Sequence, residues 1–115
     1  MLNTRVRKTV QVICVMGALL AGVSHAQAQT YTERGTITTI EAGWSQETMA
    51  VWHSAAMINT PCTVKNYGYA TDPADSGRSL FHMVILNAFL NKREVQLVVS
   101  GCVFGKPKII GVKVY

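Results

Sequence analysis

Apolar and polar residues alternate over much of the chain after residue 34, which is the pattern of half-buried β-strands. β-Branched residues between Gly35 and Ile40 predict a first strand that ends at Gly43. Two interleaved sets of apolar and small residues predict a second strand over Glu47–Met57. A third strand is expected over Cys62–Tyr69, because the Asn59-Thr60-Pro61 segment breaks the pattern before it.

The same alternation returns in the C-terminal part of the chain. It predicts a fourth strand over Glu94–Cys102 and a fifth over Lys108–Tyr115. A turn at Gly105-Lys106-Pro107 is expected to join these two strands. Two segments lack the pattern: Gln29–Glu33 is expected to be polar and mobile, and Thr71–Gly77 has the composition of a loop.

The segment Ser79–Asn91 has a different pattern. It is apolar at most positions, without alternation and without a break, so its length favours a helix over a strand. Asp75 or Ser76 would cap the N-terminus of this helix. Five strands with one helix between the third and the fourth form the element order of an OB-fold, a small Greek-key barrel. Another α+β sheet with one helix on its face is the alternative.

This helix carries more apolar surface than a small barrel can cover. One face is formed by Leu80, Val84 and Ala88 together with Phe81, Ile85 and Phe89, and a second, offset face by Met83, Leu86 and Leu90. A helix that is apolar nearly all round is normally buried on both sides. We therefore expect the second face to be an interface between copies of the chain, in a homo-oligomer. A loop or the N-terminal tail folded over that face is the alternative.

The first 28 residues have the organisation of a secretory signal peptide. Basic residues open the chain, an apolar run extends from Val10 to Val23, and Ala26-Gln27-Ala28 has the small residues of a cleavage site. The run of about 14 residues is shorter than the roughly 20 that cross a bilayer. We expect cleavage after Ala28, with Ala26 as the alternative, a mature OB-fold domain over residues 29–115, and a secreted or periplasmic location. No membrane span is expected after processing.

Removal of this segment changes the charge balance. Of the eleven Lys and Arg residues, three lie in the signal peptide, and the remaining eight face six acidic residues. The mature charge of about +2 does not suggest a nucleic-acid partner. Lys106, Lys108 and Lys113 form a basic group near the last strand, where charge also discourages edge-to-edge pairing of strands.

Two cysteines, Cys62 and Cys102, remain after processing, and in a secreted domain of this size we expect them to form a disulfide. His53 and His82 are the remaining histidines, and neither has another His or Cys at the spacing of metal ligands. The sequence therefore predicts no metal site and no cofactor. The serines lack a nucleophile-elbow context and the histidines lack a local partner, so we expect a protein that is not an enzyme.

The sequence resembles one family, the B subunits of AB5 toxins of the subtilase-cytotoxin and pertussis-like group. The resemblance rests on a short secreted OB-fold, the strand Gly35–Gly43, a helix followed by Val95-Gln96-Leu97, and Cys102 after that strand. It implies a ring of subunits, five in that family, whose helices line the centre, with glycans bound on the outer barrel surface and a secreted A-type partner chain. Two motifs of the family are missing. Val51-Trp52-His53 offers no cysteine where the family has one, and Thr32-Glu33-Arg34 stands in place of its glycan-contacting serine, so no binding residue is transferred.

The residues themselves suggest a ligand site at the first turn. Trp44 lies beside Ser45 and Gln46, and an exposed indole flanked by hydroxyl and amide groups is a surface on which a sugar ring can stack. A Trp44 folded back to plug the barrel is the alternative. Trp52, on a strand, is expected in the core or in an interface, and Tyr67 and Tyr69 are expected to be packing residues.

Two functions remain open. The first is an oligomeric, non-catalytic binding subunit of the toxin-B type that recognises glycans or carries a partner chain. The second is a stand-alone secreted or periplasmic OB-fold module that binds a protein or small ligand, as an inhibitor or envelope accessory.

Overall fold

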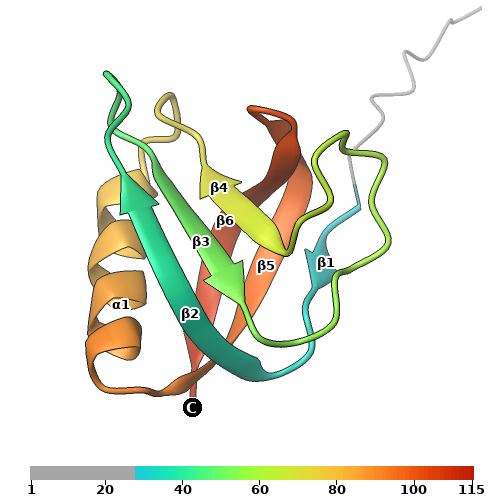
Figure 1. The fold of residues 1–115 in the computed structure, drawn as a ribbon. Coiled ribbons are helices and arrows are strands. Elements are labelled where there is room, and N and C mark those ends of the chain that lie inside the picture. Colours follow the sequence, from blue (N-terminus) through green and yellow to red (C-terminus); the bar gives the residue numbers. More distant parts are fainter. Residues whose placement is uncertain (1–27) are drawn as a thin grey trace, which may run out of the picture.

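The computed structural model describes residues 28–115 and is mostly β with one helix (Figure 1). The expected signal peptide lies outside the described residues except for Ala28. The elements in chain order are β1 (Thr30–Tyr31), β2 (Gly35–Ala42), β3 (Met49–His53), β4 (Gly68–Thr71), α1 (Arg78–Leu90), β5 (Glu94–Val103) and β6 (Lys106–Val114). Within this described part, no helix is long and apolar enough to cross a membrane.

The strands close into a ring. β2 pairs with β3, β3 with β4, β4 with β6, β6 with β5, and β5 again with β2. All of these pairs are antiparallel except β4–β6, which is parallel. The ring encloses the apolar core, in which Val51, Tyr69, Leu97 and Ile109 are completely buried. Alternation along each strand sends these residues inward and leaves their neighbours on the outer surface.

Helix α1 covers one side of the ring, where it packs against β2 and β6 (Figure 1). It begins at Arg78, with Gly77 at the N-cap, so the predicted side-chain cap from Asp75 or Ser76 is wrong. The Asp75 carboxylate instead accepts the Gly77 N–H at 2.8 Å, which stabilises the preceding turn. The helix ends because Lys92 takes a left-handed φ of 51°, and the Arg93 N–H turns back to the Ala88 carbonyl at 2.9 Å.

The third predicted strand is largely wrong. Residues 54–67 form a long loop, and β4 begins only at Gly68. Tyr67 has a φ of 66°, which is incompatible with an extended strand, and the Asn66 side chain accepts the Gly68 N–H at 3.1 Å. The second predicted strand is correspondingly shorter, since β3 ends at His53.

The segment expected to be mobile is instead ordered at its centre. Thr30 and Tyr31 pair with Val99 and Val98 of β5 as the short strand β1. Thr32 follows, 1% exposed, and its hydroxyl accepts the Leu97 N–H at 2.9 Å. The hydrogen bond between this buried hydroxyl and the backbone holds the segment in place, although its polar composition predicted a mobile tail.

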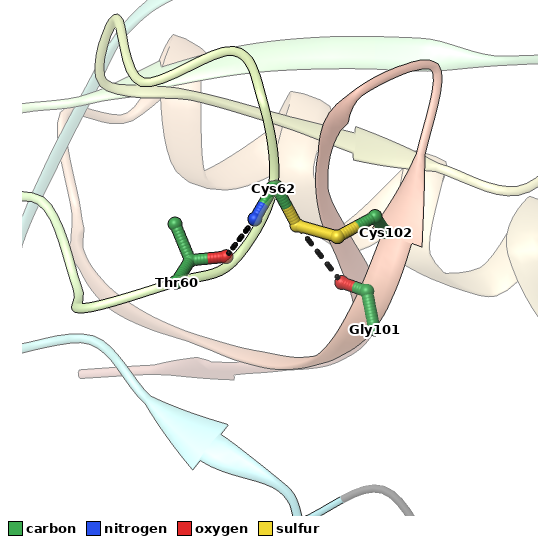
Figure 2. Close-up of a disulfide and its surroundings, with 4 residues drawn as sticks. All are labelled: Thr60, Cys62, Gly101 and Cys102. Atoms are coloured by element: carbon green, nitrogen blue, oxygen red, sulfur yellow. Dashed lines mark hydrogen bonds between the residues drawn. A yellow bond between two sulfur atoms is a disulfide. The ribbon is translucent and has the colours of Figure 1, made fainter.

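The structure contains the predicted disulfide between Cys62 and Cys102, with 5.7 Å between their Cα atoms. Figure 2 shows Cys62 between Thr60 and Gly101: its N–H donates to the Thr60 hydroxyl at 3.1 Å, and its sulfur lies 3.6 Å from the Gly101 carbonyl oxygen. Cys62 is in the 54–67 loop and Cys102 is in β5. The bond therefore ties the longest loop to the β5–β6 hairpin and does not join two strands.

Candidate functional site

A cavity of about 290 Å³ opens on the outer surface of the ring between two turns. One turn joins β2 to β3 and the other joins β5 to β6, and Figure 1 shows both at the same end of the molecule. The cavity is lined by Glu41, Trp44, Gln46, Thr48, Ala50, Ala70, Phe104 and Lys106. The two aromatic side chains are among the most exposed large apolar residues described, at 78% for Trp44 and 52% for Phe104.

Both aromatic residues occupy left-handed backbone positions. Trp44 and Ser45 have φ angles of 61° and 69°, and the Gln46 N–H closes their turn on the Gly43 carbonyl at 3.4 Å. Phe104 and Gly105 have φ angles of 51° and 74° in the turn between β5 and β6. Positive φ at both central residues is the mark of a type I′ turn, which normally uses Asn-Gly or Asp-Gly. A bulky residue in this conformation is an outlier, and such strain concentrates at functional sites.

The floor of the cavity is formed by small residues. Ala50 of β3 pairs with Ala70 of β4, and both lie on the outer face because their neighbours Val51 and Tyr69 point into the core. Two methyl groups at the centre of a sheet surface leave room for a flat ligand between Trp44 and Phe104.

Polar groups surround this floor. In the part of the chain that the structure describes, the side chains of Glu41, Gln46 and Lys106 make no internal hydrogen bond or ion pair. The Thr48 hydroxyl donates to the Thr71 carbonyl at 2.6 Å and keeps its lone pairs for an acceptor role. The site therefore offers a carboxylate, an amide and an ammonium group whose hydrogen bonds are available to a ligand. An apolar cavity with a few convergent polar groups is the usual form of a small-molecule site.

The structure brings together only part of the predicted site. Trp44 and Gln46 line the cavity, and the exposure of Trp44 rules out the alternative in which it plugs the barrel. Ser45 is exposed in the same turn but is not among the lining residues. Sequence reasoning missed Glu41, Phe104 and Lys106. A Phe-Gly pair between two alternating segments was the available signal, because it stands where Asn-Gly is expected in a hairpin turn.

The other aromatic residues considered from the sequence differ in their exposure to solvent. Tyr69 is completely buried, and burial raises the pKa of its hydroxyl. Tyr67 is 52% exposed in the 54–67 loop. Trp52 is partly buried and lies on the outer face of β3, because His53 and Val51 on either side of it point inward.

The helix leaves its second face uncovered in the single chain. Met83, Leu86 and Leu90 are 56%, 44% and 67% exposed, whereas Ile85 and Ala88 are buried against the ring. Leu80, which was expected on the buried face, is 57% exposed and extends the uncovered surface. We call these four residues, Leu80, Met83, Leu86 and Leu90, the exposed leucine face. Nothing in the described part of the chain covers it, so its role as an oligomer interface stays a prediction.

The two histidines have separate internal partners. The His53 Nε2–H donates to the Val95 carbonyl at 3.0 Å, and its Nδ1 accepts the Ala55 N–H at 3.3 Å. His82 Nε2 lies 2.6 Å from the Thr71 hydroxyl oxygen. Burial, and then the nearby Arg78 guanidinium, lower the pKa of His82, and the hydrogen bond from Arg78 lowers the pKa of the Glu47 carboxyl. Among the described residues, no three His, Cys, Asp or Glu side chains gather as a metal site requires.

Comparisons with protein-family models, with curated proteins and with solved structures found no match for this chain. Its function is therefore argued from the cavity, the turns that frame it and the surface of α1.

Proposed function

We propose that this chain is a secreted, non-catalytic binding subunit with an OB-fold, which assembles as a homo-oligomer and recognises glycans in the cavity between Trp44 and Phe104. The observation that carries the proposal is the pair of exposed aromatic side chains held in strained turns on either side of a small-residue floor. Two aromatic faces with hydrogen-bonding groups around them suit a sugar ring, which has apolar C–H faces and a rim of hydroxyl groups.

The strand order supports the OB-fold assignment. The five long strands follow the order β2-β3-β4-β6-β5 around the ring, with α1 between β4 and β5. OB-folds bind oligosaccharides and oligonucleotides on the face of their second and third strands and on the turns that join strands one to two and four to five. The cavity uses the corresponding four elements here, which are β3, β4 and the turns that carry Trp44 and Phe104.

The charge of the cavity favours a glycan over a nucleic acid. Lys106 shares the cavity with the Glu41 carboxylate, so the lining as a whole carries no net charge. Nucleic-acid sites derive most of their affinity from basic groups that neutralise phosphates, and a carboxylate opposes this. The resemblance to toxin B subunits, and with it an A-type partner chain, is part of the same proposal.

Binding to a glycan array tests the proposal directly. The protein is exported, purified with its disulfide intact and applied to the array beside its Trp44→Ala variant. We expect the wild type to retain one class of glycans and the variant to bind them at least about tenfold more weakly, a loss of about 1.4 kcal/mol. The melting temperature should change little, because Trp44 is 78% exposed.

Two results would contradict the proposal. A wild-type protein that retains no glycan argues against carbohydrate recognition and for the stand-alone module with another ligand. A Trp44→Ala variant that melts far below the wild type shows instead that the indole has a structural role.

A further inference from the structure

Trp52 forms a second flat aromatic surface next to the cavity. It lies on the outer face of β3, directly opposite Gly68 of β4. A Cβ atom built on Gly68 would stand 3.2 Å from Cε2 and 3.3 Å from Nε1 of the indole, so the ring lies across the glycine backbone. A side chain at position 68 would press on the indole, and glycine lets the indole rest against the sheet at this point.

Lys106 connects this surface to the cavity. Its side chain lines the cavity, and its ammonium nitrogen lies 5.5 Å from the centroid of the Trp52 ring. Gly68 lies beneath the indole and is itself buried, and the next outer-face pair along the same two strands is Ala50 and Ala70 of the cavity floor. The Trp52 indole and the cavity floor are therefore neighbours on one sheet surface.

We propose that Trp52 is a second sugar platform, so that the ligand is an oligosaccharide of at least two residues with one ring in the cavity and the next on Trp52. This inference rests on the proposed glycan-binding function. A cavity of about 290 Å³ is at the lower limit of small-molecule sites and suits one sugar ring, so a longer chain must continue over the surface. The sheet surface toward Trp52, past Lys106, is the continuation that offers an aromatic face.

The free hydrogen-bond donors of this region fit the same ligand. In the described part of the chain, neither the indole Nε1–H of Trp52 nor the Lys106 ammonium is used in an internal hydrogen bond or ion pair. An ammonium group 5.5 Å from the centroid of a partly exposed ring is held weakly, and the flexible lysine side chain can move from the indole to the hydroxyl groups of a bound sugar. Lys106 would then bridge the two bound rings.

The two tryptophans of the chain, Trp44 and Trp52, provide a residue-specific measurement. Each gives one indole N–H signal in a ¹H–¹⁵N correlation spectrum. The signal that is missing from the spectrum of the Trp44→Ala variant belongs to Trp44, so the remaining signal belongs to Trp52. An array of glycans from monosaccharides to hexasaccharides identifies the glycan that binds most tightly. This glycan and, separately, its terminal monosaccharide are then titrated into the labelled protein. We expect the monosaccharide to shift only the Trp44 signal and the longer glycan to shift both.

Two variants at position 52 complete the test. Trp52→Leu, which keeps an apolar side chain, should weaken binding of the longer glycan at least tenfold and change monosaccharide binding less than twofold. Trp52→Phe keeps a ring and should retain most of the affinity. If Trp52→Leu does not fold, the wild-type titration alone decides the matter.

The outcomes separate this inference from the proposed function. Shifts of Trp44 with every glycan and none of Trp52, or an affinity that is independent of glycan length, would overturn the second platform while leaving glycan binding intact. A wild type that binds no glycan overturns both. Equal or tighter binding of single-stranded oligo-dT would also overturn the inference, because it would show that nucleobases, and not sugar rings, stack on Trp44 and Trp52.

Discussion

Phe104 stands where a hairpin turn would normally place asparagine. A left-handed backbone costs a bulky residue roughly 1–2 kcal/mol, and asparagine reduces this cost because its short side chain bonds locally. With its ring 52% exposed, Phe104 recovers little of that cost through packing. A phenylalanine at this position therefore fits the proposed contact with a ligand.

Phe104→Asn should consequently stabilise the fold and weaken ligand binding. We expect the free energy of unfolding to rise by up to about 1 kcal/mol, with a melting temperature several degrees higher. Affinity for the glycan should fall at least about tenfold, a loss of about 1.4 kcal/mol. Thermal denaturation and glycan binding measure the two effects, and Phe104→Tyr is the matched control that retains the ring. A lower free energy of unfolding for Phe104→Asn would show instead that Phe104 stabilises the fold.

His82 joins α1 to the end of β4. Its Nε2 lies 2.6 Å from the hydroxyl oxygen of Thr71, which is completely buried and accepts the Met49 N–H at 2.9 Å. The charged groups facing His82 are Arg78 and Glu47, which form an ion pair with each other. Protonation of His82 would create a partly buried positive charge and place it beside Arg78.

Stability should therefore fall as the solution becomes acidic. The folded-state pKa of His82 lies below its ordinary value of 6.5, so the unfolded chain binds the proton more readily. The stability is complete above 6.5 and declines as the pH falls through that value. Glu47, with its own pKa lowered from 4.5, loses its contribution only at lower pH.

Urea unfolding between pH 7 and pH 5 tests this expectation. His82→Gln keeps an acceptor for Thr71 without a titrating group, so its free energy of unfolding should decline less over this range than that of the wild type. Parallel declines in the two proteins would show that His82 does not control this pH dependence.

At the scale of elements, the 54–67 loop supports the turn that carries Phe104. Within this loop the Val64 N–H donates to the Gly105 carbonyl at 2.8 Å. A Cβ on Gly105 would stand 2.8 Å from the Thr63 hydroxyl oxygen, so the loop packs closely on the turn. The disulfide between Cys62 and Cys102 holds the loop in this position.

Removal of the disulfide should affect both stability and binding. The bond closes a loop with a sequence separation of 40 residues. Its loss in the Cys62→Ala, Cys102→Ala double variant should lower the free energy of unfolding by roughly 3–4 kcal/mol. Glycan affinity should also fall in the variant that remains folded, because Phe104 loses its support. Chemical denaturation and array binding measure these effects. Unchanged affinity in the folded variant would show that the hairpin positions Phe104 without help from the loop.

At the scale of the whole molecule, the exposed leucine face is the largest unexplained apolar surface of α1. Each fully buried Leu or Met side chain contributes roughly 1.5–3 kcal/mol, and here Leu80, Met83, Leu86 and Leu90 remain mostly in water. Contact between copies would recover part of this burial, and a closed ring satisfies every copy equally.

Leu86→Glu with Leu90→Lys should dissociate the oligomer without unfolding the chain. The new side chains are four residues apart, in the orientation that favours a helix, so α1 should persist. Ala56→Glu with Asn59→Lys introduces the same charges at exposed positions of the 54–67 loop, on the other side of the ring from α1 (Figure 1), as a control. Analytical ultracentrifugation should show a folded monomer for the first variant and a wild-type oligomer for the second. A wild-type monomer at micromolar concentration would refute the proposed ring of subunits.

The hydrophobic pattern by itself determined the strands that are half buried and the helix. β2 was predicted close to its observed bounds because β-branched residues follow one another along it, and β5 and β6 because apolar residues alternate along much of their length. α1 was predicted because a long apolar run without alternation favours a helix. The two cysteines that remain after the predicted cleavage determined the disulfide. Trp44 was identified because an indole next to glycine, serine and glutamine is typical of an exposed turn and not of a strand.

Only the tertiary structure decided the rest. Cys62–Asn66 has β-forming residues but forms a loop, because the disulfide and the bond from Val64 to Gly105 hold it against a distant hairpin. Polar Thr32 is buried because Leu97 supplies its partner. Phe104 and Lys106 lie about sixty residues after Trp44 in the chain and meet it only when the β4–β6 and β2–β5 pairs close the ring. Contacts of this kind depend on long-range pairing, which leaves no local pattern in a sequence.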